Sequence, residues 1–313
     1  MHLEIRDPAG AAVAAAIEAR FRAASEDWYA FGTGELARVN ALLARGRPAP
    51  VSPTLAPLIT RALDLHARSG GLFDPGVCGL VRLWQFDSEA DLATAAGPPP
   101  AAEIRALLAR QGHFADLRFD GHTVAATQPL CIDLGGMAKG SALERARQLL
   151  VRGGVHNALV DIGGSSQLAL GWKNGRPWMI GLRDPRADRI LGRLALADGE
   201  AVSTSGDYER AYSLKGQRYH HVLDPRTGEP SVGSASVTVV AGDAELADAA
   251  STALMVAGPR RFEALCAALQ LRDALLITTT GELLTTPGMA ARLRRDNGGQ
   301  LPRPGSPAQG VDL

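Results

Sequence analysis

The first third of the chain has the hydrophobic spacing of helices. Apolar residues recur at helical intervals over residues 11–24, which predicts one helix there. A second helix is expected after Ser52-Pro53, because serine is a common N-cap and proline suits the first helical position. Gly70-Gly71 should end that helix. Its apolar face would be formed by Leu55, Leu58, Ile59, Ala62, Leu63 and His66.

Short apolar runs separated by glycines and Asp-Pro turns begin near Phe114. Gly97-Pro98-Pro99-Pro100 indicates a linker before them, followed by a short helix over residues 101–110. Strands are expected at residues 130–133, 155–162, 177–182, 201–205, 218–223, 236–241 and 274–278. Helices are expected at residues 138–152, 246–257 and 260–269.

These elements show no clean alternation of strand and helix, which disfavours a simple doubly wound sheet. The prediction is an α+β fold in which mixed or antiparallel sheets pack with helices. A single domain is expected over residues 1–296, either undivided or with two lobes divided near residues 97–113. The Gly- and Pro-rich residues 297–313 are expected to form a disordered tail.

The composition argues against two classes of partner. Lys plus Arg and Asp plus Glu both number 33, so no bulk positive field exists to attract nucleic acid. The apolar stretches are too short to span a bilayer, and the first residues do not have the pattern of a signal peptide. Cys78, Cys131 and Cys266 have wide, unpatterned spacing and are expected to be buried free thiols.

The first polar motif is Asp133-Leu134-Gly135-Gly136-Met137-Ala138-Lys139-Gly140. An acidic residue ends the expected strand, two glycines allow a tight turn, and a lysine lies in the first turn of a helix. Backbone N–H groups at a helix start suit a phosphate, and Lys139 adds a positive charge. The motif is neither a Walker A loop nor a GxGxxG fingerprint. An ordinary strand–turn–helix with a solvated lysine explains it equally well.

Two further polar segments follow. Gly163-Gly164 after an apolar strand indicates either close approach of a ligand or, more simply, a bulge. Residues 203–210 and 219–228 gather hydroxyls, carboxylates, an arginine and the His220-His221 pair, a costly set to bury without hydrogen-bond partners. A surface β-turn explains residues 224–228 well, but it does not explain the adjacent histidine pair.

The last polar pair is Asp248 and Thr252, which are four residues apart on an expected helix and so share one face. A carboxylate and a hydroxyl on one face suit a hard cation such as Mg²⁺, which prefers oxygen ligands. The alternative is structural: an aspartate favoured by the helix dipole, and a threonine bonded to its own helix. Taken alone, the pair favours the structural alternative.

In this order, the four segments resemble the ApbE family of FAD:protein FMN transferases. The resemblance begins near Glu35-Leu36-Ala37-Arg38-Val39-Asn40, continues through Gly71-Leu72-Phe73-Asp74-Pro75-Gly76, and covers roughly residues 10–285. The family's Met-Gly-Thr element is not found in this sequence, and Ser251 stands where some relatives have a second carboxylate.

The resemblance implies an ApbE-like fold and a specific set of site residues. Asp248, Thr252 and the backbone carbonyl of Gly136 would hold Mg²⁺. An aromatic residue near the Glu35 motif should stack on the ligand, and Tyr29 is preferred over Trp28 and Phe31. The remaining residues implied to contact FAD are Leu72, Phe73, Asp74, Asp133, Lys139 and Leu223.

The implied reaction is transfer of FMN from FAD, the donor substrate, to a Ser or Thr hydroxyl of an acceptor flavoprotein, with release of AMP. Mg²⁺ would neutralise charge on the leaving phosphate, and His221 is the candidate general base because a histidine pKa lies near working pH. Two alternatives are an FAD carrier without activity and an FAD pyrophosphatase that uses water. Relatives usually act outside the cytoplasmic membrane, and the sequence itself does not indicate a compartment.

Overall fold

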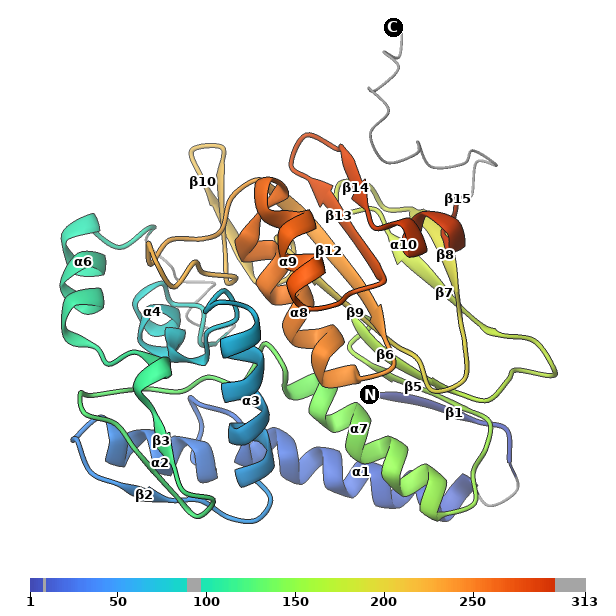
Figure 1. Ribbon diagram of the computed structural model, residues 1–313, viewed down its shortest axis with the longest axis horizontal. Helices are drawn as coiled ribbons and strands as arrows, with labels where there is room; N and C mark the ends of the chain where they lie inside the picture. The colour runs from blue at the N-terminus through green and yellow to red at the C-terminus, as the bar shows by residue number, and fades with distance from the viewer. Residues whose placement is uncertain (8–9, 89–96, 296–313) are drawn as a thin grey trace, which may run out of the picture.

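A seven-stranded antiparallel sheet forms the centre of the computed structural model (Figure 1), which describes residues 1–7, 10–88 and 97–295. Each neighbouring pair of its strands is antiparallel. In spatial order the strands are β1 (His2–Ile5), β5 (Ala158–Ile162), β6 (Ser166–Leu170), β9 (Ala201–Gly206), β12 (Ser234–Ala241), β13 (Asp273–Thr278) and β14 (Leu283–Thr285).

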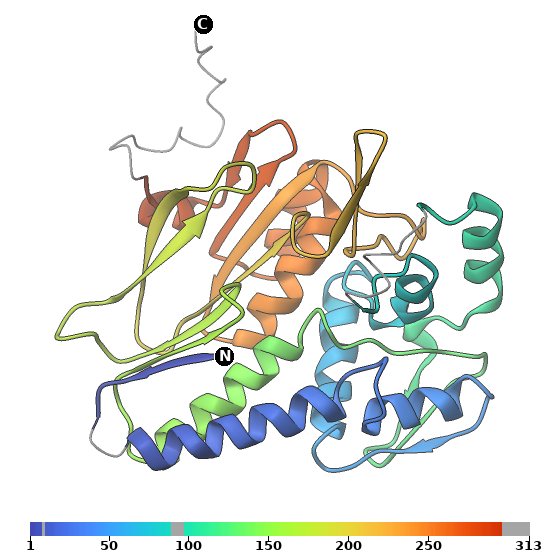
Figure 2. The ribbon, with the colours of Figure 1, turned by 180° about the vertical axis from the view of Figure 1, so that it is seen from behind.

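Helices cover one face of this sheet and a second sheet covers the other (Figure 2). The helices are α1 (Gly10–Asp27), α7 (Ala138–Arg152) and α8 (Ala244–Ala257), with α1 packed along α7. The second sheet contains β7 (Trp178–Arg183), β8 (Ile190–Leu196) and β15 (Arg294–Arg295). Because both faces of the central sheet are covered, β12 and β13 are almost entirely buried.

A second group of elements packs against α8. It contains α2 (Glu35–Leu43), α3 (Ala56–Arg68), α4 (Cys78–Leu83), α6 (Ala101–Arg110) and the small sheet of β2 (Ala49–Pro50), β3 (Arg118–Phe119) and β4 (Thr123–Ala125). The largest apolar core joins this group to α8 and β12, through residues such as Leu36, Leu58, Val237 and Leu254. The other elements are the β10 (Ala211–Leu214) and β11 (Gln217–His220) hairpin, α9 (Phe262–Ala268) and α10 (Pro287–Arg292).

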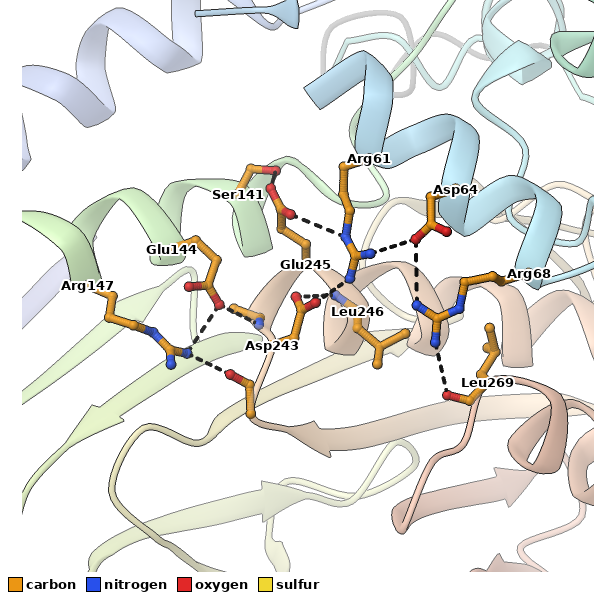
Figure 3. A network of polar contacts seen from close by, with 12 residues as sticks. Arg61, Asp64, Arg68, Ser141, Glu144, Arg147, Asp243, Glu245, Leu246 and Leu269 are labelled. Carbon is orange, nitrogen blue, oxygen red and sulfur yellow. Dashed lines mark hydrogen bonds and ion pairs between the residues drawn. The ribbon is translucent and has the colours of Figure 1, made fainter. Parts of the chain in front are cut away.

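The start of α8 is fixed by a polar network between α3, α7 and α8 (Figure 3). Arg61 of α3 donates hydrogen bonds to Asp64 and Asp243, and its Nε lies 3.4 Å from Glu245. Ser141 of α7 donates to Glu245 at 2.7 Å. Asp243 also caps α8 by accepting a hydrogen bond from Leu246 N at 2.9 Å. The network holds the helix that carries Asp248 and Thr252 at a fixed position relative to α7.

Several local predictions agree with the structure. The helices expected over residues 101–110 and 138–152 have the observed bounds of α6 and α7. The helix expected after Ser52 begins later, at Ala56, because Ser52 Oγ caps a preceding turn by accepting hydrogen bonds from Thr54 N and Leu55 N. The strands that the sequence did not predict are β1, β2, β3, β4, β6, β8, β10, β14 and β15. The division near residues 97–113 stays a prediction, and residues 297–313 lie outside the described part of the chain.

The strand predicted over residues 130–133 is wrong. This segment joins no sheet, because loop contacts satisfy its backbone groups instead. The Asn40 side chain donates to Ile132 O and accepts from Ile132 N, both at 2.8 Å. Asp133 N donates to Pro75 O at 2.8 Å. The segment is therefore held in place without strand neighbours.

The expectation of three free thiols is also wrong. Cys78 and Cys131 form a disulfide, with Cα atoms 5.3 Å apart, and only Cys266 is a free cysteine among the described residues. The two partners are 53 residues apart in sequence. They meet because the turn at Pro75 packs against Asp133. Within the described part of the chain, no helix has the length and apolar character needed to cross a membrane.

Gly140 allows α7 and α8 to approach closely. A Cβ at this position would lie 2.3 Å from Ala244 O and 2.8 Å from Glu245 Cα. We expect Gly140→Ala to lower the free energy of unfolding by about 1–3 kcal/mol, because helix backbones cannot move apart without disturbing the core. Urea or thermal unfolding of the purified variant measures this change.

Gly79→Ala on α4 is the matched control. A Cβ there would meet only the ends of the Gln111 and Leu107 side chains, at 3.1 Å and beyond, and these can move. Alanine also has a higher helix propensity than glycine, so this variant should be about as stable as the parent protein or slightly more stable. Equal destabilisation at the two positions would contradict the proposed role of Gly140.

Candidate active site

A cavity of about 320 Å³ lies where α8, the start of α7 and the end of β9 meet. The structure brings together at this cavity all but one of the site residues named from the sequence. The residues on its wall are Leu72, Phe73, Asp74, Asp133, Gly136, Lys139, His221, Leu223, Asp248 and Thr252. Tyr29 lies in a neighbouring cavity.

Asp248 is buried at the interface between α7 and α8. Its Oδ2 accepts a hydrogen bond from Gly140 N at 2.9 Å, and Ser166 Oγ lies 3.5 Å from its Oδ1. Burial raises the pKa of Asp248, and the positive charge of Lys139 offsets part of that shift. A cation beside Asp248 would therefore favour its ionised form.

Thr252 lies one turn further along α8. Its Oγ1 is 3.4 Å from Asp248 O and 3.3 Å from Ser205 Oγ, so the hydroxyl reaches both its own helix and the end of β9. Ser205 also contacts Ser251 Oγ at 2.7 Å. Thr252 thus contacts its own helix, as the structural alternative from the sequence expects, but its hydroxyl also faces the cavity.

Gly136 approaches Thr252 closely. A Cβ on Gly136 would lie 3.4 Å from Thr252 Oγ1 and 3.2 Å from the Phe73 ring. Gly136, Thr252 and Asp248 therefore lie at the same cavity, where a backbone carbonyl, a hydroxyl and a carboxylate would be the candidate ligands. This all-oxygen set fits Mg²⁺, which uses one or two carboxylates and completes its shell with water and substrate phosphates. No cluster of three His, Cys, Asp or Glu side chains suited to a metal occurs in the described residues.

Two tight turns carry two further carboxylates of the cavity. Asp133 accepts a hydrogen bond from Gly135 N at 2.9 Å, and Asp74 accepts one from Gly76 N at 2.6 Å. Burial raises the pKa of both groups. Because the disulfide and the Asp133–Pro75 hydrogen bond join these turns, their side chains hold fixed relative positions.

Lys139 lies in the first turn of α7 and faces the cavity. Its Nζ donates to Ser165 Oγ at 2.7 Å, in the turn formed by Gly163 and Gly164. Both glycines have φ near +70°, so the Gly163-Gly164 pair is a tight left-handed turn beside the cavity. The simple bulge considered from the sequence is replaced by a turn that anchors the lysine.

His221 lies between the β10–β11 hairpin and the cavity. Its Nδ1 is buried and has no hydrogen-bond partner among the described residues. Burial, followed by the positive charge of nearby Arg210, lowers the pKa of His221 to about 3. The imidazole is therefore neutral near neutral pH. Its neighbour His220 has a structural role, because its Nε2 lies 2.9 Å from Ser231 O.

The surrounding polar residues serve the fold. Asp207 is buried and paired with Arg186 and Arg218. Asp224 accepts hydrogen bonds from Arg226, and its carbonyl accepts from Thr227 N at 3.2 Å, which closes the β-turn expected from the sequence. These contacts explain most of the polar cluster without a ligand.

Tyr29 lines a second cavity of about 190 Å³, next to Trp28 and Phe31. All three aromatic residues considered from the sequence therefore lie at this second cavity. The Tyr29 hydroxyl donates to Asp87 O, and its ring meets Phe31 edge-on. Sequence reasoning gave no role to Ser205 or Arg210, although both lie in motifs that it singled out.

Comparison with known proteins accounts for this arrangement. A family model described as the ApbE family matches residues 1–276 of the chain. The chain belongs to the ApbE family. The ApbE protein from Thermotoga maritima has a TM-score of 0.84 to this structure, with 30% identity and 94% of both chains covered. The apo flavinyl transferase ApbE from Pseudomonas stutzeri has a TM-score of 0.79, with 30% identity and coverage of 93% and 92%. The predicted ApbE-like α+β fold is confirmed.

Curated relatives of this ApbE-family chain are named FAD:protein FMN transferase. The relative from Rhodobacter capsulatus is 40% identical over 290 residues, which cover 91% of this chain and 54% of the relative. The relative from Klebsiella pneumoniae is 34% identical over 224 residues, with coverage of 69% and 63%. The chain thus spans between about half and two thirds of the length of these two relatives.

The low pKa of His221 has a measurable consequence for the stability of this ApbE-family chain. Between pH 6.5 and about 3 the unfolded histidine binds a proton that the folded one does not. The contribution of His221 to the free energy of unfolding is therefore fully present above pH 6.5. It is lost as the pH falls, and the free energy of unfolding then decreases by at most about 1.4 kcal/mol per pH unit.

We expect His221→Asn to remove this slope. Denaturant unfolding at pH values from 4 to 7 should show a smaller rise in stability with pH than the parent protein shows. His122→Asn, at an exposed histidine, is the matched control and should follow the parent curve. Parallel curves for the parent protein and His221→Asn would contradict a buried neutral imidazole.

Proposed function

We propose that this protein transfers FMN from FAD to a Ser or Thr hydroxyl of an acceptor flavoprotein and releases AMP. The observation that carries the proposal is the buried Asp248 carboxylate beside Thr252 and the Gly136 loop, at a cavity that also contains Lys139 and a neutral His221. Curated relatives named FAD:protein FMN transferase support the same chemistry.

The reaction requires one bond to form and one to break at phosphorus. The acceptor hydroxyl oxygen attacks the FMN-side phosphorus of FAD, and the bond to the bridging oxygen breaks, so that AMP leaves with that oxygen. Mg²⁺ held by Asp248, Thr252 and the Gly136 carbonyl would supply positive charge for the diphosphate.

The chain's own groups have separate tasks in this proposal. His221 accepts the hydroxyl proton at its imidazole, which burial keeps neutral. Lys139 adds positive charge beside Asp248 at the start of α7. The Leu72–Asp74 turn and Leu223 form part of the wall around the ligand and limit access of water.

We expect Asp248→Asn to reduce FMN transfer by more than about 100-fold. Even outer partners of metal ligands contribute about 10- to 100-fold, and Asp248 is the only carboxylate of the proposed ligand set. The assay incubates the protein with FAD, Mg²⁺ and an acceptor flavoprotein domain, and it follows covalent flavin fluorescence on the denatured acceptor. Chelation of the metal by EDTA should stop transfer by the parent protein as well.

The matched control is Glu263→Gln, which changes an exposed carboxylate on α9 and should leave transfer unchanged. Full activity of Asp248→Asn would refute its role in metal binding. Release of FMN and AMP without labelling of the acceptor would identify a pyrophosphatase. Tight FAD binding without any AMP release would identify a carrier.

A further inference from the structure

The two cavities at the site share one wall. The larger, of about 320 Å³, contains Asp248 and Thr252, and the smaller, of about 190 Å³, is bordered by Trp28 and Tyr29. The residues common to both are Asp133, Gly135, Lys139 and Arg210. A ligand that occupies both cavities must therefore pass these four residues.

The two cavities differ in chemistry. Apart from the four shared residues, the smaller cavity is lined by aromatic residues, alanines and Ser25, whereas the larger has carboxylates and hydroxyls among its apolar residues. FAD has a matching division, because two aromatic ring systems are joined by a charged diphosphate. A diphosphate that crosses the shared wall would lie between Lys139 and Arg210.

The two cations at the shared wall are not equivalent. Lys139 Nζ already donates to Ser165 Oγ at 2.7 Å, and its charge acts on buried Asp248. Arg210 makes one side-chain hydrogen bond in the described structure, from Nη1 to Phe86 O at 3.3 Å, and it pairs with none of the described carboxylates. The Arg210 guanidinium is exposed and keeps donors available for a ligand.

The backbone fixes where Arg210 lies. Arg210 O accepts a hydrogen bond from His221 N at 3.0 Å, just before the β10–β11 hairpin begins. Arg210 also lies near Asp133 and His221, because its positive charge lowers the pKa of both groups. The residue is thus held at the junction by the hairpin, while its side chain is anchored by a single contact.

We propose that Arg210 binds the diphosphate of FAD where it passes from one cavity to the other. A planar guanidinium can donate two parallel hydrogen bonds to phosphate oxygens, which a lysine ammonium cannot match. This inference rests on the proposed function, and it makes Arg210 a determinant of selectivity for phosphate-bearing flavins. A ligand that lacks phosphate gains nothing from Arg210.

The test compares ligands that differ in phosphate. Dissociation constants for FAD and for riboflavin are measured by flavin fluorescence in EDTA, so that no metal-dependent turnover alters the FAD. Arg210→Ala should weaken FAD binding by about 10- to 100-fold, the effect expected for a lost pair of charge-assisted hydrogen bonds. Its dissociation constant for riboflavin should stay within about two-fold of the parent value on the same reasoning.

Two further variants sharpen the result. Arg210→Lys should recover part of the FAD affinity, because it keeps the charge and loses the planar geometry. Arg152→Ala removes an exposed arginine at the opposite end of α7, about 20 Å along the helix from Lys139, and should bind FAD normally. Unchanged melting temperatures would show that the variants fold.

Each outcome decides between defined alternatives. If the parent protein binds no FAD, the proposed function and this inference both fail. If the parent binds FAD and Arg210→Ala binds it equally well, the proposed function survives and the inference is overturned. Equal weakening of FAD binding and riboflavin binding would also overturn the inference. Arg210 would then contact the flavin rings or stabilise the fold instead of binding the diphosphate.

Discussion

The buried carboxylate of Asp248 is the constraint on which the rest of the site depends. A buried carboxylate costs several kcal/mol unless partners compensate for lost hydration. Here Gly140 N, Ser166 Oγ and the charge of Lys139 supply part of that compensation. Gly140 can donate this bond only because its missing side chain allows α7 to lie against Ala244. The close packing of α7 against α8 is therefore also what brings a stabilising hydrogen bond to the buried carboxylate of Asp248.

The same packing determines which other segments reach the cavity. Once α8 is fixed against α7, Thr252 lies one turn along α8 and meets both Ser205 at the end of β9 and the Gly136 loop. Asp133 and Lys139 flank that loop and extend the wall into the aromatic cavity beside Trp28. Because the Asp133 segment is held by Asn40 and the Cys78–Cys131 disulfide, the wall is formed before any ligand binds.

Sequence patterns predicted the parts of this structure that are local. The bounds of α7 and the shared face of Asp248 and Thr252 follow from helical spacing alone. The failures involve contacts between distant segments. Residues 130–133 resemble a strand, but Asn40, 92 residues away from Ile132, satisfies their backbone. Cys78 and Cys131 pair only after two turns meet in the folded chain. Arg210 lies within a recognised motif, yet its position between two cavities exists only in three dimensions.

The proposed diphosphate contact also bears on His221. Burial is the main cause of its low pKa, and the positive charge of Arg210 is the next. An anion paired with Arg210 would cancel that charge and favour the protonated imidazole, which raises the pKa of His221 toward the working pH. The histidine would then be a weak base in the free protein and a stronger one when substrate is bound. The arginine that binds the diphosphate would thereby link substrate binding to proton transfer.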